Sequence, residues 1–250
     1  MTKKFVLGSV VILSLMMLFS ACSTKADVEF RNRAEPVVHR ESAAERGKGA
    51  QGFDKDEEHP SNSGEGIYHP TGRELDEVEI ADLIFMREEE KVARDVYAYL
   101  YSQWNLPVFD SIAQSEQNHM DAILELLTAY AIDDPVTENN PGVFTDETLQ
   151  KLYDDLIARG SQSLEEALRV GALIEEVDIL DLEEAVQNTD KVDIQRVYSN
   201  LLFGSENHLR SFTSQLSRQL GIVYSPTNLT QERYEEIVNG QPGQRGRAAK

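Results

Sequence analysis

The chain has 250 residues, which is enough for one globular domain with appended segments, and its formal net charge at pH 7 is −20. This acidity argues against nucleic acid as a partner, because nucleic-acid binding requires basic surfaces, and against electrostatic adhesion to anionic lipid. The single cysteine, Cys22, excludes a disulfide within the chain and a thiolate metal site.

The beginning of the chain has the pattern of a secretory signal. Lys3 and Lys4 precede an apolar run over residues 5–19, which is short for a membrane span and has no stop-transfer flank. Residues 18–22, Leu-Phe-Ser-Ala-Cys, resemble a bacterial lipobox. That resemblance implies lipidation of Cys22 and a lipid-anchored place in the bacterial cell envelope, at the outer membrane if the source has two membranes. Residues 1–22 are therefore the predicted lipoprotein signal and lipobox. The alternative is an ordinary cleaved signal with a leftover cysteine.

Composition divides the rest of the chain into a tether, a domain and a tail. Residues 23–70 are polar, charged and without sustained apolar periodicity, which predicts a flexible tether. Residues 71–240 carry helical periodicity and form the predicted domain. Residues 241–250 are expected to be a disordered tail.

Apolar residues at helical spacing predict four long helices in this domain. They cover about residues 71–104, 110–130, 163–187 and 192–220. The first is expected to begin at a capping box, Thr71 to Glu74. Asp110 is the expected N-cap of the second, and Ser163 that of the third.

The connections between these helices are short, long and short. The long one, over about residues 131–162, contains a short predicted helix near residues 148–158, and a final short helix is expected near residues 231–238. One long connection between antiparallel helix pairs is the connectivity of ferritin-like folds. We therefore predict an all-α protein, a ferritin-like antiparallel four-helix bundle with one long crossover that contains a short helix.

Glu116 and His119 stand three residues apart on the apolar face of the second predicted helix, together with Ile112 and Ile123. An acid and an imidazole in a core are costly unless something compensates them, and a bound metal ion is one such compensator. Carboxylate-bridged di-iron bundles use a Glu-x-x-His pair of this kind. The pair also arises by chance, so its meaning depends on the other helices.

Each of the other long helices points polar side chains to its apolar face. Glu90 lies on the stripe of the first helix, with Tyr97 seven residues later on the same face. Glu175 and Asp178 share a face of the third helix, and His208 lies on the apolar face of the fourth. All four helices therefore offer metal-ligating side chains to one interior.

Four motifs carry a resemblance to a known family. They are EEEKVARDVY at 88–97, SEQNHM at 115–120, GALIEEVDI at 171–179 and GSENHLRSF at 204–212. In this order they resemble the ferritin-like family called domain of unknown function 2202 over about residues 74–239, and more distantly rubrerythrin. The resemblance implies six metal ligands, namely Glu90, Glu116, His119, Glu175, Asp178 and His208.

Two further residues follow from the resemblance. Tyr97 is implied to be a partner of a metal ligand. Ser205 stands where the family pattern of rubrerythrin has a Glu, and a hydroxyl is a poor substitute for a carboxylate. We therefore expect an asymmetric centre, with one metal position well supplied and a second one weak.

Carboxylates and imidazoles without thiolate suit iron or manganese, with zinc as an alternative. The expected function is a membrane-anchored domain that binds such a metal in redox or oxidative-stress chemistry, whether or not it is an enzyme. The alternative is a non-enzymatic envelope lipoprotein with a vestigial or zinc-filled site. The expected partners are a metal ion and the membrane, through Cys22, and not nucleic acid; a homodimer is left open.

Overall fold

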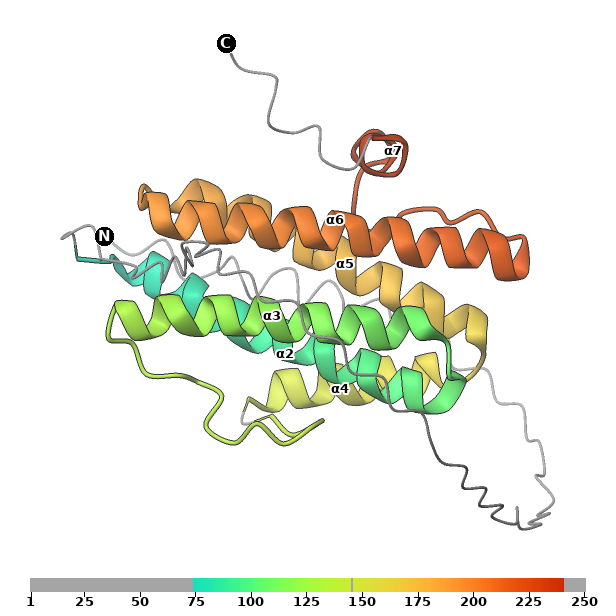
Figure 1. Cartoon of the computed structure of the whole chain (residues 1–250), viewed down its shortest axis with the longest axis horizontal. Coiled ribbons are helices and arrows are strands. Elements are labelled where there is room, and N and C mark those ends of the chain that lie inside the picture. Colours follow the sequence, from blue (N-terminus) through green and yellow to red (C-terminus); the bar gives the residue numbers. More distant parts are fainter. Residues whose placement is uncertain (1–73, 145, 241–250) are drawn as a thin grey trace, which may run out of the picture. The chain divides into compact units, whose positions relative to one another are not determined.

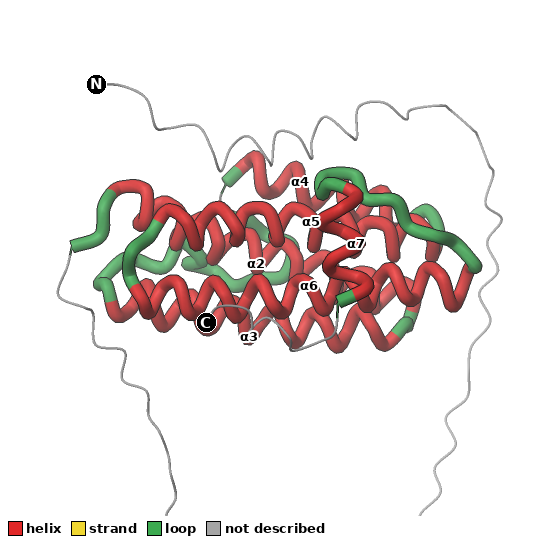
Figure 2. Tube along the Cα trace, turned by 90° about the horizontal axis from the view of Figure 1, so that it is seen from above, coloured by secondary structure: helices red, strands yellow, loops and turns green. Residues whose placement is uncertain are grey.

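The computed structural model describes residues 74–144 and 146–240, and all regular secondary structure in these ranges is helical (Figures 1 and 2). The helices are α2 (Glu77–Trp104), α3 (Pro107–Ala129), α4 (Glu147–Gly160), α5 (Leu164–Asn188), α6 (Val192–Leu220) and α7 (Gln231–Asn239). The all-α prediction is confirmed. The predicted signal with Cys22, the tether and the tail lie outside the described residues. Among the described helices, none is both long and apolar enough to cross a membrane.

The four long helices form two antiparallel pairs, α2 with α3 and α5 with α6 (Figure 1). α3 ends beside the start of α6, where the Tyr130 hydroxyl donates to Asp193. The connection then returns along the bundle, and α4 ends beside the end of α2, where Trp104 donates to the Gly160 carbonyl. α5 therefore starts at the opposite end of the bundle from the place where α3 stops (Figure 1). This is the long crossover with a short helix that the sequence predicts.

The first two long helices begin at other residues than the sequence predicts. α2 starts at Glu77, and Asp76 forms its capping box with Glu79, so the box predicted from Thr71 to Glu74 is wrong. Thr71 itself lies outside the described residues. α3 starts at Pro107, whose fixed φ suits the first helical turn, and Asp110 lies within that turn rather than at the N-cap.

Buried charged side chains fasten the crossover to α2. Lys91 donates to Asp95, with a nitrogen–oxygen distance of 2.6 Å, and to the carbonyls of Asn140 and Val143. Its ammonium also lies 4.0 Å from the ring centre of Phe144. Each hydrogen of the Lys91 ammonium has an acceptor. These hydrogen bonds, two of them to the crossover, offset the cost of burying the ion pair.

A buried carboxylate fastens the segment after α6. Glu176 in α5 accepts hydrogen bonds from the backbone amides of Thr227, Asn228 and Leu229 and from the Tyr224 hydroxyl. The segment therefore packs against α5 without forming a regular element of its own, and it leads into α7.

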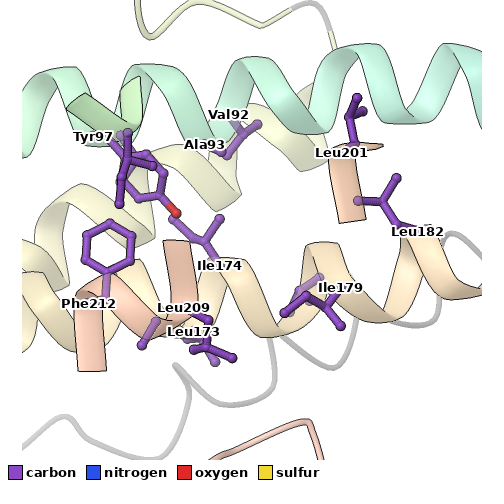
Figure 3. Close-up of a cluster of buried hydrophobic side chains, with 14 of the residues drawn as sticks. Val92, Ala93, Tyr97, Leu173, Ile174, Ile179, Leu182, Leu201, Leu209 and Phe212 are labelled. Atoms are coloured by element: carbon purple, nitrogen blue, oxygen red, sulfur yellow. The ribbon is translucent and has the colours of Figure 1, made fainter. Parts of the chain in front are cut away.

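Aromatic rings from α2, α3 and α6 pack together in the core, and Figure 3 shows two of them, Tyr97 and Phe212. The ring centres of Tyr97 and Phe212 lie 5.1 Å apart, and those of Phe109 and Phe212 lie 5.6 Å apart. Gly171 in α5 makes room for these rings, because a Cβ atom at this position would lie 2.6 Å from Phe212. The close approach explains a glycine in the interior of a long helix, where it costs helix propensity.

Gly171→Ala should lower the free energy of unfolding by about 1–3 kcal/mol, because the added methyl group overpacks the Phe212 ring. Thermal and urea denaturation measure the loss. The same substitution should cost less in a Phe212→Leu background, where the clashing ring atoms are absent. An equal loss in both backgrounds would show that the contact with Phe212 is not the cause.

Candidate metal centre

The six sequence-predicted ligands are buried, and they come from all four long helices. α2 contributes Glu90, α3 contributes the Glu116 and His119 pair, α5 contributes Glu175 and Asp178, and α6 contributes His208. Spacings of three residues place the paired side chains on one face of each helix. The packing of α2 on α5 and of α3 on α6 brings these faces together in the interior.

Five of these residues form two groups of metal-ligating atoms that share one carboxylate. Glu90, Glu116 and His119 each place one donor atom within 4.8 Å of the others, and so do Glu116, Glu175 and His208. Each group combines two carboxylates with one imidazole. Glu116 therefore lies at the middle of the site, between the two histidines.

Each oxygen of Glu116 lies within ion-pair distance of one imidazole nitrogen. Nδ1 of His119 lies 2.7 Å from Oε2 of Glu116, and Nδ1 of His208 lies 2.9 Å from Oε1. Both Glu116 oxygens and Nδ1 of His208 nevertheless lack a hydrogen-bond partner of suitable geometry. Buried polar atoms without partners are rare in proteins, and an ion is one explanation for them. The orientation of these atoms fits donors that face a common cation.

Asp178 lies beside these groups and belongs to neither of them. Ser205 donates a hydrogen bond to Oδ2 of Asp178, while Oδ1 is buried without a partner. The serine therefore orients a carboxylate instead of replacing one. Glu206, the nearest acid in α6, forms an ion pair with Arg233 of α7 at 2.5 Å. The two groups have equal donor composition, and the asymmetric metal centre expected from Ser205 stays a prediction.

Two hydroxyl groups contact the candidate ligands and orient them. The Tyr97 hydroxyl donates to Oε1 of Glu175 at 2.5 Å, which agrees with the role expected for this residue. Nε2 of His208 lies 3.0 Å from Oγ of Ser115. A hydrogen bond at Nε2 fixes the imidazole and leaves Nδ1 as the nitrogen that faces Glu116 and Glu175. Ser115 is absent from the sequence-predicted site, because its contact joins two helices and has no spacing signature.

Gly204 in α6 makes room for the His119 imidazole. A Cβ atom at this position would lie 2.6 Å from Nε2 of His119 and 2.7 Å from Cε1. Any larger residue would displace the ring from its place beside Glu90 and Glu116. The sequence carries one signal for this role, a glycine inside a helix three residues after the apolar Leu201, but that signal does not indicate which side chain needs the room.

Protons compensate the buried acids when no cation is bound. Burial raises the pKa of Glu90 to about 7 although His119 opposes the shift, and burial together with the Glu116 carboxylate raises the pKa of Glu175 to about 7. Burial alone would lower the pKa of His119, but Glu90 and Glu116 raise it to about 12. Likewise, against the effect of burial, Glu116 and Glu175 raise the pKa of His208 to about 10.

Metal binding removes the need for these protons. Two divalent cations and two neutral imidazoles would balance the charges of Glu90, Glu116, Glu175 and Asp178 without any proton. Nitrogen and oxygen donors without sulfur suit iron, manganese or zinc. The residues present therefore fit a divalent metal centre, which Glu90, Glu116, His119, Glu175 and His208 would hold.

The metal-free protein should lose stability as the pH rises from 5 to 9. Glu90, Glu175, His119 and His208 all have raised pKa values, so the folded state holds protons that the unfolded state releases, and rising pH favours unfolding. The stabilisation by added Mn²⁺ should grow over the same range, because the metal displaces these protons. Melting temperatures with and without MnCl₂ measure both effects.

A Glu90→Gln variant separates this effect from general charge repulsion. Without a titrating acid at this position, the metal-free variant should lose less stability between pH 5 and 7 than the wild type. Identical slopes for both proteins would contradict the assignment.

Comparisons with known proteins agree with the resemblance seen in the four motifs. Residues 79–241 match the model of a family described as an uncharacterized protein domain, DUF2202. The uncharacterized protein MJ0754 of Methanocaldococcus jannaschii is 48% identical over 165 residues, which cover 66% of this chain and 89% of that protein. The crystal structure of the hypothetical protein MJ0754 from Methanococcus jannaschii superposes with a TM-score of 0.66 at 46% identity, over 68% of this chain and 97% of that chain. The chain therefore belongs to the DUF2202 family.

Proposed function

We propose that the helical domain binds two divalent metal ions, iron or manganese, in the interior of the bundle. The observation that carries the proposal is the position of Glu116, which belongs to both donor groups and places each of its buried oxygens against a different imidazole, at 2.7 and 2.9 Å. A carboxylate that faces two separate imidazole-containing groups is suited to bridge two cations, as in carboxylate-bridged di-metal bundles.

Each residue has a distinct task in this centre. Glu116 bridges the two positions. Glu90 and His119 complete one of them, and Glu175 and His208 complete the other. Asp178 lies next to both with its Oδ1 atom unpaired, so it supplies a further carboxylate to either ion.

The chemistry of the donors favours a redox or metal-handling function over a purely structural one. Bound iron or manganese would supply one-electron chemistry at a site that the bundle shields from bulk water. Tyr97 holds Glu175 through a 2.5 Å hydrogen bond, which orients this ligand before the metal binds. A domain that only served as an envelope interaction module, with a vestigial or zinc-filled site, would not need two complete donor groups.

The full chain, purified in detergent without chelator, should contain about two metal ions per chain when it is saturated with Fe²⁺ or Mn²⁺. Glu116→Gln should remove both ions, because both positions share this carboxylate. His119→Ala should remove about one. Elemental analysis after gel filtration gives the stoichiometry, and the melting temperature reports binding to the folded state.

Glu88→Gln is the matched control, because Glu88 is a neighbouring acid of α2 that lies near Asp146 and Lys91 rather than in the donor groups. This variant should bind as much metal as the wild type. If the wild type binds no iron or manganese, or if Glu116→Gln binds as well as Glu88→Gln, the metal proposal is wrong. Zinc bound alone, without redox response, would favour the envelope interaction module.

We also propose that the mature protein is lipidated at Cys22 and anchored in the bacterial cell envelope. The support is the segment 18–22 and the absence of any other cysteine in the sequence. Cys22→Ala should leave the precursor unprocessed or release the protein from membranes, because the acyl chains provide the attachment. Membrane fractionation and metabolic labelling with an alkyne fatty acid measure this. Unchanged processing and unchanged membrane partition in Cys22→Ala would contradict it.

A further inference from the structure

Acidic side chains continue along the interface of α2 and α5, from the candidate centre toward the start of α2. Asp178, Glu89, Asp181 and Asp82 form this series, which we call the acid file. α2 and α5 run antiparallel, so residues before Glu90 in α2 lie beside residues after Asp178 in α5. At the outer end, Asn188 of α5 donates to Oδ2 of Asp82 at 3.0 Å, which fixes the register of the two helices.

The carboxyl groups of Glu89 and Asp181 face each other across this interface. Oε2 of Glu89 and Oδ2 of Asp181 are buried and accept no hydrogen bond from an N–H group or an alcohol, and the two carboxyl groups hydrogen-bond each other. Asp181 is only 7% exposed, and Asp178 only 5%. Two facing carboxyl groups in an interior require a shared proton or a cation, because two bare charges repel.

Buried polar atoms without partners are concentrated in the centre and the acid file. Nine such side-chain atoms occur among the described residues. Seven of them belong to the centre or the acid file, and the other two belong to Tyr198 and Asn228. In most proteins such atoms are few, and each marks strain, a function, or a bound water or ion. Here most of them are concentrated in the centre and the acid file.

A neighbouring cavity is a poorer path for an ion. It has a volume of about 20 Å³, enough for about one water molecule, and Glu89 is the only polar residue in its lining. The other lining residues are Val92, Leu149, Leu152, Leu156, Ile174 and Val177. Apolar walls cannot replace the water ligands of a divalent cation, whereas carboxylates can replace them one after another.

The outer end of the acid file is open to solvent and strongly acidic. Asp82 is partly exposed, and Glu184 lies near Asp181 on the solvent side of α5. In a chain of net charge −20, this end concentrates cations from solution. Among the described residues, the donors to these acids are neutral: Asn188 donates to Asp82, and Ser205 donates to Asp178.

We propose that Asp82, Asp181, Glu89 and Asp178 form the route by which divalent cations reach and leave the candidate metal centre. This inference rests on the proposed function, because a route requires a destination. Each carboxylate takes over part of the hydration shell of the ion, and the Glu89 and Asp181 pair is the step between solvent and the buried ligands. The route changes how fast the centre fills and empties, and not how tightly it binds.

Asp181→Asn tests the route, because the amide keeps the shape of the side chain and removes its charge. The full chain is mixed with Mn²⁺ in a stopped-flow instrument, and uptake is followed by the loss of free Mn²⁺; release is followed after adding excess chelator. We expect uptake and release both to slow by about tenfold or more, which is within the range of electrostatic steering. The stoichiometry and the equilibrium dissociation constant should stay within about twofold of the wild type.

Glu88→Gln is again the matched control and should leave both rates unchanged. Glu89→Gln is the second variant, since it removes the same facing pair from the α2 side, and it should reproduce the slow rates if Asp181→Asn does not fold. If both variants fold and show wild-type rates of Mn²⁺ uptake and release, the proposed route is wrong, while the proposed metal centre is unaffected. Slow Mn²⁺ uptake with accelerated release would show that the Glu89 and Asp181 pair is a metal ligand, and the proposed route would then also be wrong. A wild-type chain that binds no Mn²⁺ would remove the metal centre itself.

Discussion

The structure depends on the compensation of charge in the interior of a helical bundle. Four carboxylates and two imidazoles converge where the long helices meet, and water cannot solvate them there. Glu116 is the extreme case, because burial opposes its charge while the two imidazoles hold its pKa below the ordinary range. The surrounding helices must keep these groups at fixed distances, since a shift of one partner would leave a buried charge without compensation.

The parts of the protein outside the four long helices serve this requirement by immobilising the bundle. The crossover is held on α2 by Lys91 and by Arg87, which forms an ion pair with Asp134 at 2.9 Å. α7 is held by Arg233, which pairs with Glu183 of α5 and Glu206 of α6. Charged side chains therefore have two roles in this protein: some hold neighbouring segments on the bundle, and others face the centre. The surrounding residues determine which role each one has.

Sequence reasoning could find what depends on spacing within one helix. The interval between Glu116 and His119, and the stripe that contains Glu90, are fixed by helix geometry alone. The end of α6 at Gly221 was equally predictable, because glycine adopts the left-handed conformation that ends a helix. The starts of α2 and α3 were not. Several acids near the start of α2 could serve as a cap, and α3 begins at Pro107 without any side-chain cap.

Sequence reasoning failed where a role arises between helices. Ser115 meets His208 from another helix, and Gly204 meets His119 across the α3 and α6 interface. From the sequence of α6 alone, Ser205 reads as the loss of a Glu ligand. The structure shows that its hydroxyl donates to Asp178 of α5, which the sequence of α6 cannot reveal. The role of the buried Lys91 is hidden for the same reason, since its acceptors lie in a loop about fifty residues away.

α5 has no solvent-facing side along much of its length. Ten consecutive residues, from Val170 to Ile179, are buried. The buried acids among them point in different directions: Glu175 faces the centre, and Glu176 faces the segment after α6. On a surface helix, the solvent-facing side tolerates substitutions that the buried side does not. A helix that is buried on all sides has no such tolerant side. α5 is therefore the element in which relatives of this protein should tolerate the fewest replacements, and any variation in the family should collect on α4, α7 and the outer faces of α3 and α6.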